Sequence, residues 1–77
     1  MLYRVVLIDD YADLRSLLIR FLERSGAFCV AAACETARDG IDAARTEQPD
    51  LVLIDLGLPD MNGLDALGPL REAAPDA

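Results

Sequence analysis

The segment Val6-Leu7-Ile8-Asp9 recurs later in the chain as Val52-Leu53-Ile54-Asp55. Each copy is an apolar run rich in β-branched residues that stops at an acidic residue, a pattern typical of a buried strand in a parallel sheet. In open α/β proteins, ligands bind beyond the carboxyl ends of such strands. The repeat therefore predicts two buried strands that deliver carboxylates to the same edge of one sheet.

The residues between these two strands show helical and then extended periodicity. Five apolar residues at helical spacing predict an amphipathic helix, and Gly26 is suited to cap its C-terminus: Leu14, Leu17, Leu18, Phe21 and Leu22. Residues 28–33 are expected to form a further strand. Thr36 and Asp39 have the spacing of a capping box, so a second helix is expected to begin there and to run to about Glu47.

The third strand, residues 51–54, follows the chain-breaking pair Pro49-Asp50. After it, Leu64, Leu67 and Leu70 predict a third helix, which Pro69 should kink or end early because proline lacks the backbone donor. Strands and helices that alternate with short connections predict an α/β fold, with a parallel sheet and right-handed crossovers.

Composition narrows the functions that this chain can perform. Its 77 residues suffice for one small domain, and a hydrophobic content of 53% argues against a disordered chain. The net charge of −7 argues against direct binding to nucleic acid, since phosphate backbones require a basic surface. All seven basic residues are arginines, so no lysine or histidine chemistry is available.

The same sequence contains no apolar run of the length that spans a membrane, and no signal peptide is recognisable. Cys29 and Cys34 lie in the apolar segment around the second strand and are expected to be buried free thiols. A cytoplasmic location is therefore expected.

Asp9, Asp10 and Asp55 are predicted to converge at the carboxyl edge of the sheet. One interpretation is structural, because aspartate is common after strands as a helix cap or turn residue. Three carboxylates this close would repel one another, however, unless a cation lies between them. Mg²⁺ prefers oxygen ligands of this kind and often also binds phosphate oxygens, so the pattern favours a metal site for phosphoryl chemistry, with Mn²⁺ as an alternative ion.

The order of strand, Asp-Asp, helix, strand, helix, Pro-Asp, strand, Asp and then Leu58-Pro59-Asp60-Met61-Asn62-Gly63 closely resembles the receiver domain of bacterial response regulators. The resemblance implies a flavodoxin-like parallel sheet, here limited to three strands in the order 2-1-3. Residues 1–77 would then form one partial receiver domain that lacks the fourth and fifth βα units of the family. The hydroxyl and lysine that those units contribute have no counterpart in this chain.

By the same resemblance, Asp55 is the phosphate acceptor, and its donor is the phosphohistidine of a sensor histidine kinase or of a phosphotransfer protein. Asp10 would bind Mg²⁺ directly and Asp9 largely through water. Asp55 itself and the backbone carbonyl of Gly57 would complete the metal ligands. Pro59 and Gly63 would shape the loop beside the site.

Two other functions are compatible with the sequence. The chain could be an interaction module that docks a partner, or a second copy of itself, through the edge of the third strand. It could also be a metal-dependent phosphatase with an aspartyl nucleophile, but that class usually has Asp-x-Asp where this chain has Asp9-Asp10-Tyr11. The expectation is a signalling module rather than an enzyme.

Overall fold

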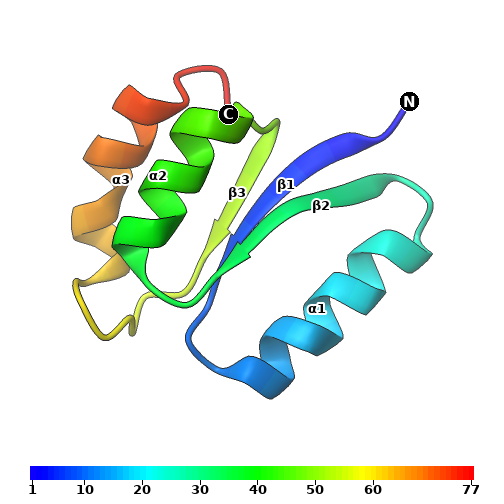
Figure 1. Cartoon of the computed structure of the whole chain (residues 1–77), viewed down its shortest axis with the longest axis horizontal. Coiled ribbons are helices and arrows are strands. Elements are labelled where there is room, and N and C mark those ends of the chain that lie inside the picture. The colour runs from blue at the N-terminus through cyan, green and yellow to red at the C-terminus, as the bar shows by residue number, and fades with distance from the viewer.

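The computed structural model describes all 77 residues as three strands that alternate with three helices (Figure 1). In chain order these are β1 Tyr3–Ile8, α1 Ala12–Arg24, β2 Phe28–Cys34, α2 Ala37–Glu47, β3 Leu51–Ile54 and α3 Gly63–Ala73. The strands are parallel and lie in the order β2-β1-β3. The predicted α/β class and the predicted strand order are therefore confirmed.

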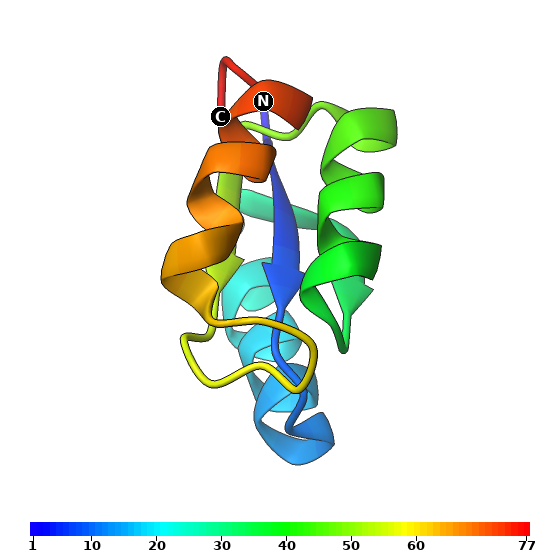
Figure 2. The same cartoon turned by 90° about the vertical axis from the view of Figure 1, so that its left-hand side faces the viewer.

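The helices cover both faces of the sheet. Helices α2 and α3 pack side by side on one face, and α1 lies on the other (Figures 1 and 2). The central strand β1 carries the core, since Val5, Val6, Leu7 and Ile8 are all almost completely buried. Figure 2 shows both termini at one end of the sheet, which leaves the loops after the strands together at the opposite end.

Helix α2 approaches the sheet closely because of one glycine. A Cβ atom at Gly40 would overlap the side chain of Ile8, the last residue of β1. Gly40 is buried, so the cost of a glycine within a helix is offset by closer packing. The start of α2 is thereby held against the end of β1.

Helix α1 buries only part of its predicted apolar stripe. Leu22 is buried, but Leu17 is 62% exposed and Phe21 is 71% exposed. The reason is that α1 packs mainly over β2 and is the only helix on its face of the sheet. The expected cap at its end is present, because Gly26 adopts a left-handed φ of 77°.

A kink or an early stop was expected at Pro69, and the early stop is wrong, because helix α3 runs past Pro69 to Ala73. Pro69 removes the hydrogen bond to the carbonyl four residues earlier, but the following turn is held by tertiary packing. Leu70 and Ala73 are buried in the core, and Gln48 Nε2 at the end of α2 donates to the Ala73 carbonyl at 2.7 Å.

The two cysteines are free but only half-buried, in contrast to the expectation of buried thiols. Both lie on β2, which is an edge strand and is covered less completely than β1. None of the helices has the length and hydropathy needed to cross a lipid bilayer.

Candidate functional site

The register of the sheet brings two of the predicted acidic residues together. Ile8 of β1 is paired with Ile54 of β3, so Asp9 and Asp55 directly follow two strand ends that lie side by side. The Asp55 amide donates to the Ile8 carbonyl at 2.9 Å, and the Asp9 amide donates to the Cys34 carbonyl at 2.9 Å. These bonds hold the backbone of both residues beside the strand ends.

Asp10 joins this pair, and the carboxylates of all three residues offer oxygens that lie within 4.8 Å of one another. Asp9 is buried, with 5% of its surface exposed, whereas Asp10 is exposed. None of the three forms an ion pair with an arginine. The cluster therefore concentrates negative charge without a protein cation to balance it, and its hard oxygen donors are the kind that Mg²⁺ and Mn²⁺ prefer.

The carboxylates are oriented partly by local hydrogen bonds. Asp9 Oδ1 accepts from the Tyr11 amide at 2.9 Å, and Asp55 Oδ1 accepts from the Gly57 amide at 3.3 Å. Arg15 Nη1 donates to the Asp9 carbonyl at 2.8 Å, and its other nitrogen Nη2 lies 3.6 Å from Glu35. Arg15 thus supports the backbone of the cluster rather than neutralising its carboxylates.

The loop from β3 to α3 is closed at its base beside the acidic cluster. Gly57 forms an antiparallel bridge with Asn62, and the Gly63 amide donates to the Leu56 carbonyl at 3.0 Å. Asn62 also caps the start of α3, because its side chain accepts from the Leu64 amide at 2.8 Å. The loop therefore places Gly57, one of the predicted metal ligands, next to Asp55.

Of the two residues expected to shape this loop, Gly63 is buried and Pro59 is exposed. A Cβ atom at Gly63 would lie 2.7 Å from the Asp55 carbonyl oxygen and 2.8 Å from Leu56 Cα. Only glycine allows the start of α3 to approach the acidic cluster so closely.

A hollow of about 280 Å³ lies next to the acidic cluster, between the ends of β1 and β3 and helix α1. Its lining combines apolar residues with two of the acidic residues: Leu7, Ile8, Asp9, Leu18, Leu53, Ile54 and Asp55. Asp9 and Asp55 therefore border a hollow on the α1 side of the sheet.

Sequence reasoning missed the role of Asp60. Its two carboxylate oxygens accept from the amides of Ala37 and Arg38, at 2.9 and 3.0 Å. These two hydrogen bonds hold the pKa of Asp60 below its usual range, and the charge of Arg38 acts in the same direction. No sequence pattern indicates such a bond, because both donors are backbone groups of a distant segment.

The family profile described as the response regulator receiver domain matches residues 5–77. The chain belongs to the response regulator receiver family. The resemblance inferred from the sequence is thereby confirmed, and so is its flavodoxin-like fold.

Individual relatives agree with this assignment. The chain is 37% identical over 68 residues to the nitrate/nitrite response regulator protein NarL of Escherichia coli K12. The matched region covers 88% of this chain and 32% of that protein. It is also 31% identical over 74 residues to the chemotaxis protein CheY of Thermotoga maritima. That match covers 96% of this chain and 61% of CheY.

Among solved structures, the chain superposes on a LuxR-family two-component response regulator from Aurantimonas sp. SI85-9A1 with a TM-score of 0.90 and 30% identity. That match covers 100% of this chain and 55% of the other. In each of these three comparisons the chain spans less than two thirds of the relative's length.

Proposed function

We propose that this receiver module accepts a phosphoryl group on Asp55, in a Mg²⁺-dependent reaction. The observation that carries this proposal is the convergence of Asp9, Asp10 and Asp55, whose carboxylates lie within 4.8 Å of one another without an arginine partner. The donor is the phosphohistidine of a sensor histidine kinase or phosphotransfer protein. Mn²⁺ is an alternative ion for the same site, because both ions bind oxygen ligands.

The residues have distinct roles in this reaction. A carboxylate oxygen of Asp55 attacks the phosphorus atom, so that a P–O bond forms while the P–N bond to the donor imidazole breaks. The imidazole leaves with the electron pair and takes a proton from solvent. Asp55 suits this role because it follows β3 at a solvent-accessible position next to the hollow. The products are an aspartyl phosphate on this chain and a neutral histidine on the donor.

Asp10, Asp55 and the Gly57 carbonyl are the groups that would bind the metal directly, and Asp9 would act largely through water. The exposure of the two side chains supports these different roles, since Asp10 is exposed and Asp9 is almost completely buried. When bound, the metal neutralises charge on the phosphoryl oxygens and aligns the phosphoryl group for attack.

Phosphorylation with a small donor tests the proposal. Wild type treated with acetyl phosphate and Mg²⁺ should gain the mass of one phosphoryl group, and beryllofluoride should shift amide resonances near Asp55. Asp55→Asn should show neither effect, whereas the exposed control Asp76→Asn should behave as wild type. A comparable signal in Asp55→Asn would contradict the assignment of the acceptor.

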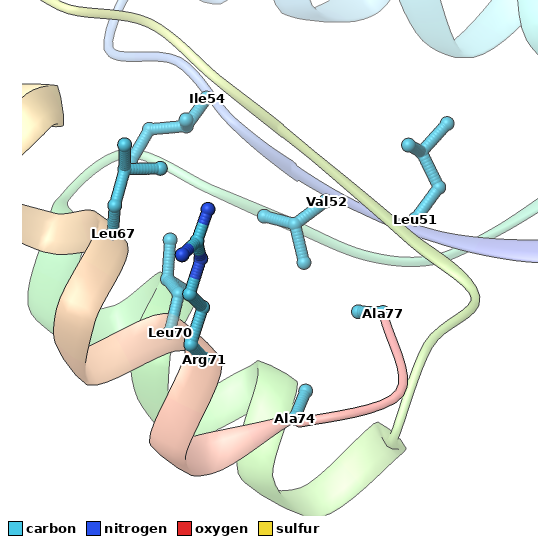
Figure 3. A pocket seen from close by; sticks show the side chains of 8 residues that line it. All are labelled: Leu51, Val52, Ile54, Leu67, Leu70, Arg71, Ala74 and Ala77. Carbon is cyan, nitrogen blue, oxygen red and sulfur yellow. The ribbon is translucent and has the colours of Figure 1, made fainter.

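A second candidate function is docking of a partner through the exposed edge of β3. A hollow of about 200 Å³ lies between this strand and α3, and Figure 3 shows side chains of both elements lining it, with the Arg71 guanidinium beside it. Seven of its eight lining residues are hydrophobic: Leu51, Val52, Ile54, Leu67, Leu70, Ala74 and Ala77. An interaction module would bind its partner without any response to beryllofluoride, which distinguishes it from a phosphoryl acceptor.

A phosphatase with Asp55 or Asp9 as nucleophile would turn over a chromogenic phosphate ester. We expect no such turnover from this module, because its aspartyl phosphate is a signal rather than a short-lived intermediate. Sustained hydrolysis that disappears in Asp55→Asn would favour the phosphatase.

A further inference from the structure

We propose that Asp60 is a positioning residue that keeps the loop carrying Gly57 in place for metal binding. This inference rests on the proposed function, because it concerns the same acidic cluster. Asp60 lies in the outer part of the β3–α3 loop, and its carboxylate accepts from the Ala37 and Arg38 amides at 2.9 and 3.0 Å. The carboxylate thus joins two loops that are far apart in the chain.

The shape of the loop explains how a contact at Asp60 reaches Gly57. The bridge between Gly57 and Asn62 closes the loop, so Asp60 lies between two residues that are paired with each other. Leu58, which is 8% exposed, belongs to the core, and Met61 packs against it, so both also fix the loop. With these contacts and the Asp60 carboxylate in place the loop has little freedom, and the Gly57 backbone keeps one position.

The start of α2 provides donors that would otherwise lack partners. The first backbone amides of a helix have no intrahelical acceptor, and the Thr36 side chain accepts only from the Asp39 amide, at 3.1 Å. Asp60 takes the Ala37 and Arg38 amides, and the positive end of the helix favours its negative charge.

Helix α2 also contacts β1, through Gly40 and Ile8, directly before Asp9. Asp60 therefore connects the loop containing Gly57 to the helix that packs against the end of β1. A metal ion bound between Asp9, Asp10, Asp55 and Gly57 needs both parts at a fixed separation.

The experiment compares Asp60→Ala and Asp60→Asn with two controls. Thr36→Ala weakens the same helix end without touching the loop, and Asp76→Asn removes one exposed charge elsewhere. Mg²⁺ affinity is measured by following backbone amide resonances during titration. We expect Asp60→Ala to weaken affinity about tenfold, as removal of groups that orient ligands does. Asp60→Asn should have a smaller effect, and both controls should stay within about twofold of wild type.

A second measurement needs no metal and no phosphorylation. In metal-free Asp60→Ala, the Gly57 and Asn62 amides should exchange with solvent faster and show lower order parameters than in Thr36→Ala. Loss of order at these amides supports the proposal even if wild type binds no Mg²⁺, a result that would overturn only the proposed function. Unchanged Gly57 and Asn62 amides in Asp60→Ala, or unchanged Mg²⁺ affinity in a binding wild type, would mean that Asp60 only caps α2.

Discussion

Gly63 lies so close to the backbone of Asp55 that a Cβ atom at position 63 would come within 2.7 Å of the Asp55 carbonyl oxygen. Both groups belong to the main chain, so neither can move away as a flexible side chain would. The start of α3 is therefore fixed directly against the predicted phosphate acceptor.

Gly63→Ala should consequently disturb both stability and the site. We expect a loss of about 1 to 3 kcal/mol in the free energy of unfolding, as in other overpacked positions, together with weaker Mg²⁺ binding. Chemical denaturation and amide titration measure the two effects. Gly68→Ala in the same helix is the control, because a Cβ there meets no atom within 4 Å apart from its chain neighbours and the backbone of its own helix. Equal behaviour of the two variants would refute the packing argument.

Mg²⁺ should stabilise the folded chain, because an ion that binds only the native state shifts unfolding by mass action. We expect millimolar Mg²⁺ to raise the melting temperature of wild type, to have the least effect in Asp10→Ala, and to have an intermediate effect in Asp9→Ala. Without metal, Asp10→Ala should melt above wild type, since the repulsion within the cluster is relieved. A wild-type melting temperature indifferent to Mg²⁺ would contradict the metal site.

A polypeptide of these 77 residues should self-associate through β3. This strand is an edge of the sheet, and an apolar strand with unpaired backbone groups is a template for pairing. Two copies paired antiparallel about Val52 and Leu53 would bring Asp50 of one close to Asp55 of the other. Their repulsion is screened by salt, so association measured by sedimentation should increase with ionic strength. A stable monomer in which β3 amides are as protected as those of β1 would rule this out.

Cys34 should make stability fall at alkaline pH. Burial raises the pKa of this thiol, Asp39 raises it further, and Arg15 acts in the opposite direction. The unfolded chain therefore loses this proton first, near the usual value of about 8.5, and stability declines from there until the raised pKa of the folded state is passed.

The measurement compares the free energy of unfolding of Cys29→Ser with that of the double variant Cys29→Ser and Cys34→Ser, from neutral pH to above the usual thiol pKa. The difference between the two curves isolates Cys34, because the tyrosines titrate in both proteins. Parallel curves over this range would show that the folded state does not perturb the thiol.

Local patterns in the sequence determined most of the fold. The strands were predictable because the runs ending at Asp9 and Asp55 are short, apolar and β-branched, and the helix after Thr36 because its cap is a neighbour in the chain. The convergence of the three aspartates was also predictable from the sequence, since parallel strands end at one edge of a sheet.

Only the tertiary structure decided the features that depend on contacts between distant segments. Pro69 lies within a continuous helix because Leu70 and Ala73 pack against α2, although local propensity favours a stop. The exposure of Phe21 and the half-burial of Cys34 depend on which elements cover α1 and β2. The bond from Asp60 to α2 joins residues more than 20 positions apart, and such a contact exists only once packing has brought the two loops together.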